Sequence, residues 1–187
     1  SLTMIDKYAG GIVPAPPAVG DEGDHDLQQA LERMLGHYRE EMNGFRFHKA
    51  LQAVWEVVGQ LNRYIVANAP WELAKDSDQA GRLAAVLALL AEGLWWMAVV
   101  LKPVMPMTAT KMAAALGMSE PFAAITLDRL TAGQAMTAGA NVAKGAQLFP
   151  RVEGKAPSAP PAKTGKLPGS TTPSAGQIEG LIRVDQV

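Results

Sequence analysis

The chain has 187 residues, of which 48% are hydrophobic, and this length suffices for one well-filled core with appendages. It contains no cysteine, which excludes disulfides, cysteine-based metal sites and a cysteine nucleophile. Residues 1–149 hold 12 basic and 15 acidic residues, and such an acidic body cannot bind nucleic acid mainly by neutralising phosphates, so a nucleic-acid reader here must work through bases.

Helical periodicity dominates the first two thirds of the chain, and no alternating strand pattern interrupts it. The expected helices span, in order, about residues 1–8, 24–42, 45–68, 76–102 and 106–116. Their capping candidates are Asp24 or Asp26, Asp76 or Asp78, and Pro106 at a first helical position. The third helix is expected to bury a face made of Phe47, Leu51, Val54, Val58, Leu61 and Ile65. This pattern predicts an all-α fold, an antiparallel helix bundle of the up-and-down kind.

Residues 83–101 are almost wholly apolar apart from Glu92, and their length nearly suffices to span a bilayer. A carboxylate near the middle of such a span would cost about 2.5–3.5 kcal/mol on insertion scales. The amphipathic helices on either side also need an apolar partner, so we expect a buried core helix and no membrane span. Trp95 and Trp96 are adjacent and point in different directions, so at least one is expected at the edge of the bundle.

Pro70 and Trp71 directly follow the third helix. Proline disfavours the helical conformation at the residue before it, so the helix is expected to end near Asn68 and a turn to follow through Asp76. A tryptophan ring just beyond a helix end, on a backbone stiffened by proline, is a flat surface at a fixed place. Such a ring can cap a hydrophobic core or provide a platform for base stacking, and the residue pattern leaves both uses open.

Residues that could carry out a reaction are scarce. His25, His37 and His48 lack a third ligand at convincing spacing, so no metal site is predicted. No serine nucleophile elbow and no glycine-rich phosphate loop are present. The chain is therefore expected to hold no catalytic residue and no cofactor of its own.

The composition changes after the predicted bundle, which we assign to residues 1–153. Residues 154–177 are dense in Pro, Ala, Ser and Gly and predict a disordered linker. Residues 178–187 regain apolar character and read as the truncated start of another domain. Nothing suggests secretion, so a cytoplasmic location is expected.

Several motifs occur in a familiar order. They are Asn62-Arg63-Tyr64-Ile65, Ala69-Pro70-Trp71, Lys102-Pro103-Val104-Met105-Pro106 and Phe149-Pro150-Arg151-Val152-Glu153. Over residues 1–153 this order resembles the anticodon-binding helix bundle of methionyl-tRNA synthetases. The Pro-x-Met-Pro turn and the apolar helix recur in the synthetases for leucine, isoleucine, valine and cysteine, whereas Ala-Pro-Trp with Phe-Pro-Arg-x-Glu points to methionine. The alternatives are the bundle of one of those other class I synthetases, or a helical protein–protein interaction bundle without RNA binding.

The resemblance implies a specific way of reading RNA. In the family the tryptophan stacks on the first base of the CAU anticodon of the methionine tRNA, a role that falls here to Trp71, with Pro70 setting the position of the ring. Asn62 and Tyr64 are the other candidates for the anticodon site, although Tyr64 could instead pack beside the tryptophan loop and Asn62 could bond backbone. The remaining candidates, which would contact phosphates or else be ordinary surface charges, are Arg63, Lys75 and Arg82.

The resemblance also implies parts outside this chain. The family's base-reading asparagine and arginine would lie before Ser1, so neither can be assigned here. The catalytic domain, which uses ATP and Mg²⁺ to attach methionine to tRNA, is not in this sequence. Residues 178–187 loosely resemble the opening of an oligonucleotide-binding C-terminal domain, which often brings homodimerisation. The expected partner is the anticodon loop of the methionine tRNA, with no DNA involved.

Overall fold

A computed structural model describes residues 2–15, 20–118, 122–130, 137–143 and 148 of the chain. Within these ranges the elements are α1 (Leu2–Ala9), α2 (Glu22–Asn43), α3 (Phe47–Asn68), α4 (Pro70–Leu73), η1 (Ser77–Gln79), α5 (Ala80–Leu101), α6 (Pro106–Ala115), η2 (Phe122–Ala124) and η3 (Leu127–Arg129). The predicted all-α bundle is confirmed. The predicted linker over residues 154–177 and the predicted tail over residues 178–187 lie outside the described ranges.

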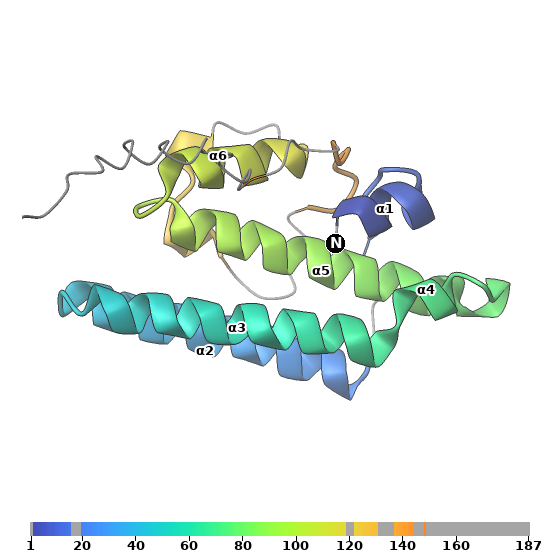
Figure 1. Cartoon of the computed structure of the whole chain (residues 1–187), viewed down its shortest axis with the longest axis horizontal. Helices are drawn as coiled ribbons and strands as arrows, with labels where there is room; N and C mark the ends of the chain where they lie inside the picture. The colour runs from blue at the N-terminus through green and yellow to red at the C-terminus, as the bar shows by residue number, and fades with distance from the viewer. Residues whose placement is uncertain (1, 16–19, 119–121, 131–136, 144–147, 149–187) are drawn as a thin grey trace, which may run out of the picture. The chain divides into compact units, whose positions relative to one another are not determined.

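Helices α2 and α3 form an antiparallel hairpin, and α5 runs back along it (Figure 1). The expected cap of α2 at Asp24 or Asp26 is wrong, because the N-cap residue is Asp21. The Asp21 carboxylate accepts from the Asp24 backbone N–H at 3.0 Å, and the Asp24 carboxylate accepts from the Asp21 N–H at 3.2 Å. This reciprocal capping box satisfies two free backbone donors at the start of the helix. Asp24 therefore lies inside the first turn, and its side chain is buried.

The apolar face of α3 is rotated from the predicted one. Val54 and Leu61 are buried as expected, but Phe47 is 49% exposed. The predicted residues that are only partly buried are Leu51, Val58 and Ile65. The fully buried positions are Ala50, Ala53, Val54, Val57, Leu61 and Tyr64. The small side chains of Ala50 and Ala53 lie on the face of α3 that packs against the rest of the bundle, where α2 is a close neighbour. The bulkier Leu51, Val58 and Ile65 lie at the edge of that buried face.

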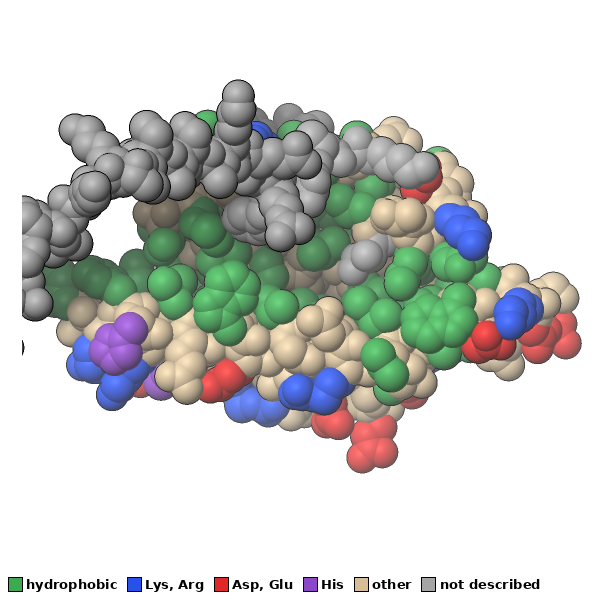
Figure 2. Space-filling view, in the orientation of Figure 1, with side chains coloured by type: hydrophobic (Ala, Val, Ile, Leu, Met, Phe, Trp, Pro, Cys, Tyr) green, Lys and Arg blue, Asp and Glu red, His purple; other side chains and the backbone are tan. Residues whose placement is uncertain are grey.

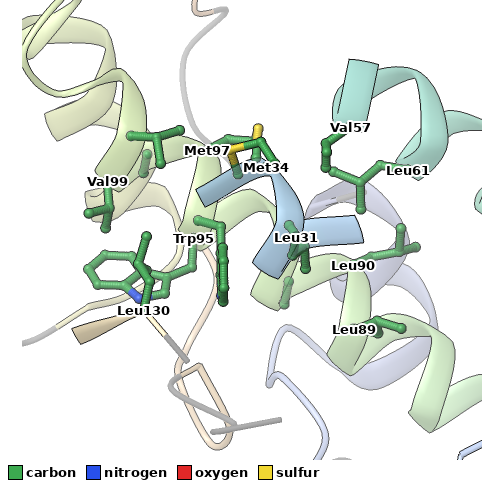
Figure 3. Close-up of a cluster of buried hydrophobic side chains, with 14 of the residues drawn as sticks. Leu31, Met34, Val57, Leu61, Leu89, Leu90, Trp95, Met97, Val99 and Leu130 are labelled. Atoms are coloured by element: carbon green, nitrogen blue, oxygen red, sulfur yellow. The ribbon is translucent and has the colours of Figure 1, made fainter. Parts of the chain in front are cut away.

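Helix α5 is the core of the bundle. The most apolar stretch of 18 residues within Ser77–Leu101 has a mean hydropathy of 2.0, and 83% of that stretch is buried inside the protein, which supports the predicted core helix over a membrane span. Its neighbours are α2 and α3 on one side and α1 and α6 on the other. Figure 3 shows Leu31 of α2, Leu61 of α3 and Leu90 of α5 converging in this core.

Both tryptophans of α5 are buried, so the expectation that one lies at the edge is wrong. Trp95 is 0% exposed and Trp96 is 1% exposed. Adjacent helical residues do point in different directions, but α5 is surrounded, so each direction meets protein. Trp95 packs edge-on against Phe122 of η2, with ring centroids 5.7 Å apart. The segment after α6 thus covers a side of α5 that periodicity alone would leave open.

Helix α6 ends at Ala115, one residue before the predicted end, and Gly117 follows its C-cap residue Leu116. Gly117 has a φ of +70°, and a side-chain carbon there would lie 2.0 Å from the carbonyl oxygen of Asn141. Only glycine therefore allows this approach of two backbone segments. The same returning segment bonds to the loop after α1, where the Val13 N–H donates to the Ala140 carbonyl at 3.0 Å and the Val142 N–H donates to the Gly11 carbonyl at 2.7 Å.

Candidate functional site

Trp71 lies on a one-turn helix that follows a left-handed residue. Ala69 has φ 39° and ψ 62°, and it both ends α3 and precedes α4. Its N–H donates to the Ile65 carbonyl at 3.0 Å, and its own carbonyl accepts from Glu72 at 2.7 Å. Pro70 is suited to the first position of α4 because it has no N–H to satisfy there. The predicted helix end before proline is confirmed, and α4 replaces the predicted turn.

The ring of Trp71 is accessible, whereas the preceding residue, Pro70, is buried. Trp71 is 41% exposed, so much of its surface is not enclosed by the core. Pro70 is packed inside the protein and fixes the backbone from which the ring projects. Of the two uses that the sequence leaves open, a partly open ring on a buried proline favours a platform over a core cap.

The outward face of α3 leads to Trp71. Asn62 is exposed, and together with Arg63, Val66 and Ala67 it lines a shallow depression. Trp55 lies two turns before Asn62 on the same face and is 54% exposed, and no sequence motif marks it. Figure 2 shows hydrophobic side chains gathered on the face that α3 and α4 present, with charged side chains along its lower margin.

Tyr64 points the other way, into the bundle. It is buried, and its hydroxyl donates a hydrogen bond to the Asp24 carboxylate. The structure therefore separates the four predicted site residues. Trp71 and Asn62 are exposed, and Pro70 and Tyr64 lie in the supporting layer.

A polar cluster joins the ends of three helices beside Trp71, and we call its members Asp21, Asp24, Tyr64, Asn68 and Arg82 the Arg82 cluster. Arg82, in the first turn of α5, donates to Asp24 at 2.6 Å and pairs with Asp21 at 2.8 Å. It also donates to the Asn68 side-chain oxygen, and the Asn68 amide donates to the Tyr64 carbonyl at 3.0 Å. The guanidinium is thus committed to protein partners.

This cluster changes the assignment of the three basic residues considered for phosphate contact. Arg82 is engaged in the Arg82 cluster and holds helices together. Lys75 pairs with Glu72 at 2.8 Å on the surface next to Trp71. Arg63 is exposed beside Asn62 and remains placed to meet a ligand.

Acidification should weaken the fold through Asp24. Burial alone would raise the pKa of its carboxyl, but hydrogen bonds from Arg82 and Tyr64 outweigh burial and hold the pKa below its usual range. A carboxyl whose pKa is lower in the folded state stabilises the fold fully above its unfolded pKa of about 4, and this contribution is lost as the pH falls through the folded pKa. In urea titrations from about pH 7 to about pH 3, wild type should therefore lose more stability than Asp24→Asn. Equal losses would contradict the assignment.

Burial and the nearby Asp24 carboxylate raise the pKa of the Tyr64 hydroxyl, which keeps it protonated and able to donate.

Asp24 and Asn68 were not recognised from the sequence as parts of a site. Asp24 did carry a signal, because it falls on the same helical stripe as buried Leu27 and Leu31 and so needs a buried partner. In the part of the chain that the structure describes, no group of histidines and carboxylates could hold a metal ion.

Comparison with known proteins identifies the family. A family model described as the anticodon binding domain of methionyl tRNA ligase matches residues 13–159. The methionine–tRNA ligases of Caldanaerobacter subterraneus subsp. tengcongensis and Streptococcus pyogenes serotype M1 are each 37% identical over 153 residues, which cover 82% of this chain and 23% of theirs. The chain thus spans about a quarter of the length of these relatives.

Solved structures agree with the sequence match. The apo form of Mycobacterium tuberculosis methionyl-tRNA synthetase superposes with a TM-score of 0.69 at 28% identity, over 80% of this chain and 30% of that one. The same enzyme bound by methionyl-adenylate also gives a TM-score of 0.69. These matches favour methionine over the leucine, isoleucine, valine and cysteine alternatives. The chain therefore belongs to the family of methionyl-tRNA ligase anticodon-binding domains.

Proposed function

We propose that this chain is the anticodon-reading module of a methionine–tRNA ligase and that Trp71 stacks on the first base of the CAU anticodon. The observation that carries the proposal is the partly exposed ring on a buried proline, directly after a left-handed residue that ends α3. Stacking on an aromatic side chain contributes about 1–3 kcal/mol per base and needs no phosphate contact. This suits a body in which acidic residues outnumber basic ones.

The four predicted residues take different roles in this proposal. Trp71 provides the stacking surface, and Pro70 fixes its backbone. Asn62, exposed on the face of α3 that leads to Trp71, is available for base-edge hydrogen bonds, with Arg63 beside it for phosphate. Tyr64 is buried and supports the site indirectly, through the hydrogen bond that its hydroxyl donates to Asp24.

The proposal extends to the parent protein. It would attach methionine to its tRNA in the cytoplasm, using ATP and Mg²⁺ in a catalytic domain, and this chain would supply recognition without a cofactor of its own. A homodimer formed through a further oligonucleotide-binding domain is part of the same proposal, as is the lack of any DNA or membrane partner.

Loss of the Trp71 ring should weaken RNA binding while the fold is kept. We expect Trp71→Ala to weaken binding of the methionine anticodon stem-loop by about 1–3 kcal/mol, because the stacking surface is removed, and Trp71→Phe to keep part of the affinity. Fluorescence anisotropy with a labelled stem-loop measures this, in this chain and in the full-length parent.

A stem-loop with the first anticodon base changed provides the matched control. Its affinity for wild type should be lower, and Trp71→Ala should reduce the difference. Equal binding of both loops by the parent would refute the base-specific reading. Binding that is insensitive to Trp71 would favour the protein–protein interaction bundle.

A further inference from the structure

Ala69, two residues before Trp71, has a backbone conformation that alanine does not prefer. Ala69 lies in the left-handed region, where a side chain crowds the backbone and glycine or asparagine is usual. Ala69 is the single residue between α3 and α4, so the direction in which the Trp71 ring projects depends on its conformation. A conformation of this kind persists when its surroundings hold it in place.

Asn68, the residue before Ala69, is held from two sides. Its amide donates to the Tyr64 carbonyl at 3.0 Å, one turn back in α3. Its side-chain oxygen accepts from Arg82 of α5. Asn68 thus links the last turn of α3 to another helix immediately before the left-handed residue.

Arg82 is a fixed anchor for this link. Its guanidinium also contacts Asp24 and Asp21 at the start of α2, and its side chain is 21% exposed. An arginine engaged by three partners has little freedom to swing. The starts of α2 and α5 and the end of α3 are therefore fixed to one another at the point where α4 begins.

We propose that Asn68 is a positioning residue for Trp71, which transmits the fixed geometry of the Arg82 cluster to the Ala69-Pro70 junction. The inference rests on the proposed function only for its consequence in RNA binding. The placement of the ring itself is a property of the free protein. Asn68 touches no base in this proposal and acts through the backbone that leads to the ring.

The test uses Asn68→Ala, which removes both hydrogen bonds and leaves the contacts between Arg82 and the two aspartates in place. The matched control is Arg46→Ala, which breaks the ion pair with Glu41 at the opposite end of the α2–α3 hairpin. Both variants disturb a polar contact to a well-shielded partner, but only the first lies beside Trp71. Circular dichroism first establishes that each variant is folded.

Fluorine NMR of the chain labelled with fluorotryptophan is the direct readout, because the four tryptophans give four signals and Trp71→Phe assigns one of them. We expect Asn68→Ala to shift or broaden the Trp71 signal while those of Trp95 and Trp96 stay in place. Arg46→Ala should leave the Trp71 signal unchanged. An unchanged Trp71 signal in folded Asn68→Ala overturns the inference.

Stem-loop binding is the second readout. Asn68→Ala should weaken it about three- to tenfold, less than Trp71→Ala does, because the stacking ring is kept but is no longer held in place, and Arg46→Ala should not weaken it. If Trp71→Ala binds RNA as wild type does, the proposed function fails while the NMR result still decides the role of Asn68. If Trp71→Ala weakens binding and Asn68→Ala does not, the inference alone fails. Asn68→Asp keeps the acceptor for Arg82 and loses only the amide donor, so it replaces Asn68→Ala should that variant not fold.

Discussion

Arg82→Ala should destabilise the bundle by about 3–4 kcal/mol in urea unfolding at neutral pH. The substitution leaves the Asp24 carboxylate, whose side chain is 7% exposed, without its cationic partner. Removing one member of a buried ion pair typically costs about 3–5 kcal/mol, because the remaining charge is uncompensated. We take the lower part of this range because Arg82 retains some contact with solvent and Tyr64 still donates to Asp24.

Two variants separate this effect from a general loss of charge. Arg39→Ala removes an ion pair with Asp128 whose side chains are 41% and 86% exposed, and it should cost less than about 1 kcal/mol. Adding Asp24→Asn to Arg82→Ala should recover part of the lost stability, because the uncompensated charge is gone. Equal effects of Arg82→Ala and Arg39→Ala would show that the Arg82 cluster does not hold the helices together.

Trp95→Ala should destabilise the fold by about 3–5 kcal/mol. The ring is fully buried in α5 against Phe122, and loss of a buried tryptophan removes its transfer free energy and leaves a cavity. Such a loss is a large part of the stability of a domain of this size. Chemical denaturation followed by circular dichroism measures the change.

Trp95→Phe is the informative companion. Among the described residues the Trp95 indole N–H has no hydrogen-bond acceptor, so phenylalanine loses volume without stranding a polar partner. We expect it to cost much less than alanine, whereas a loss as large as that of Trp95→Ala would mean that the N–H is bonded. Trp71→Ala, at a ring that is 41% exposed, should cost less stability than Trp95→Ala, because less apolar surface is buried there.

The sequence predicts best where a single residue decides the local backbone conformation. Pro70 marks the end of α3 because proline restricts the residue before it, and Gly117 follows the end of α6 because glycine readily adopts a positive φ. These local signals hold whatever packs around them. Pro70 also draws attention to Trp71, so the most specific feature of the candidate site is readable without coordinates.

Contacts between residues far apart in the sequence cannot be predicted in this way, because they depend on the whole fold. The burial of Trp95 depends on packing against Phe122, and the segment near Phe122 has no strong periodic pattern, so the sequence does not predict that both Trp95 and Trp96 are buried. The pairing of Asp24 with Arg82 joins residues 58 positions apart. The position of Asp24 on the buried stripe of α2 indicates that it needs a partner, but no local pattern identifies Arg82 as that partner.

The choice of alanine at position 69 affects the entropy of any binding event at Trp71. Glycine would adopt the left-handed conformation without strain, but it would also sample many others in the free protein. Alanine in this region costs about 1–2 kcal/mol, and the free energy of folding offsets that cost before a ligand arrives. A ligand that meets Trp71 therefore loses little affinity to ordering the junction, because the chain around Ala69 has already given up its conformational freedom.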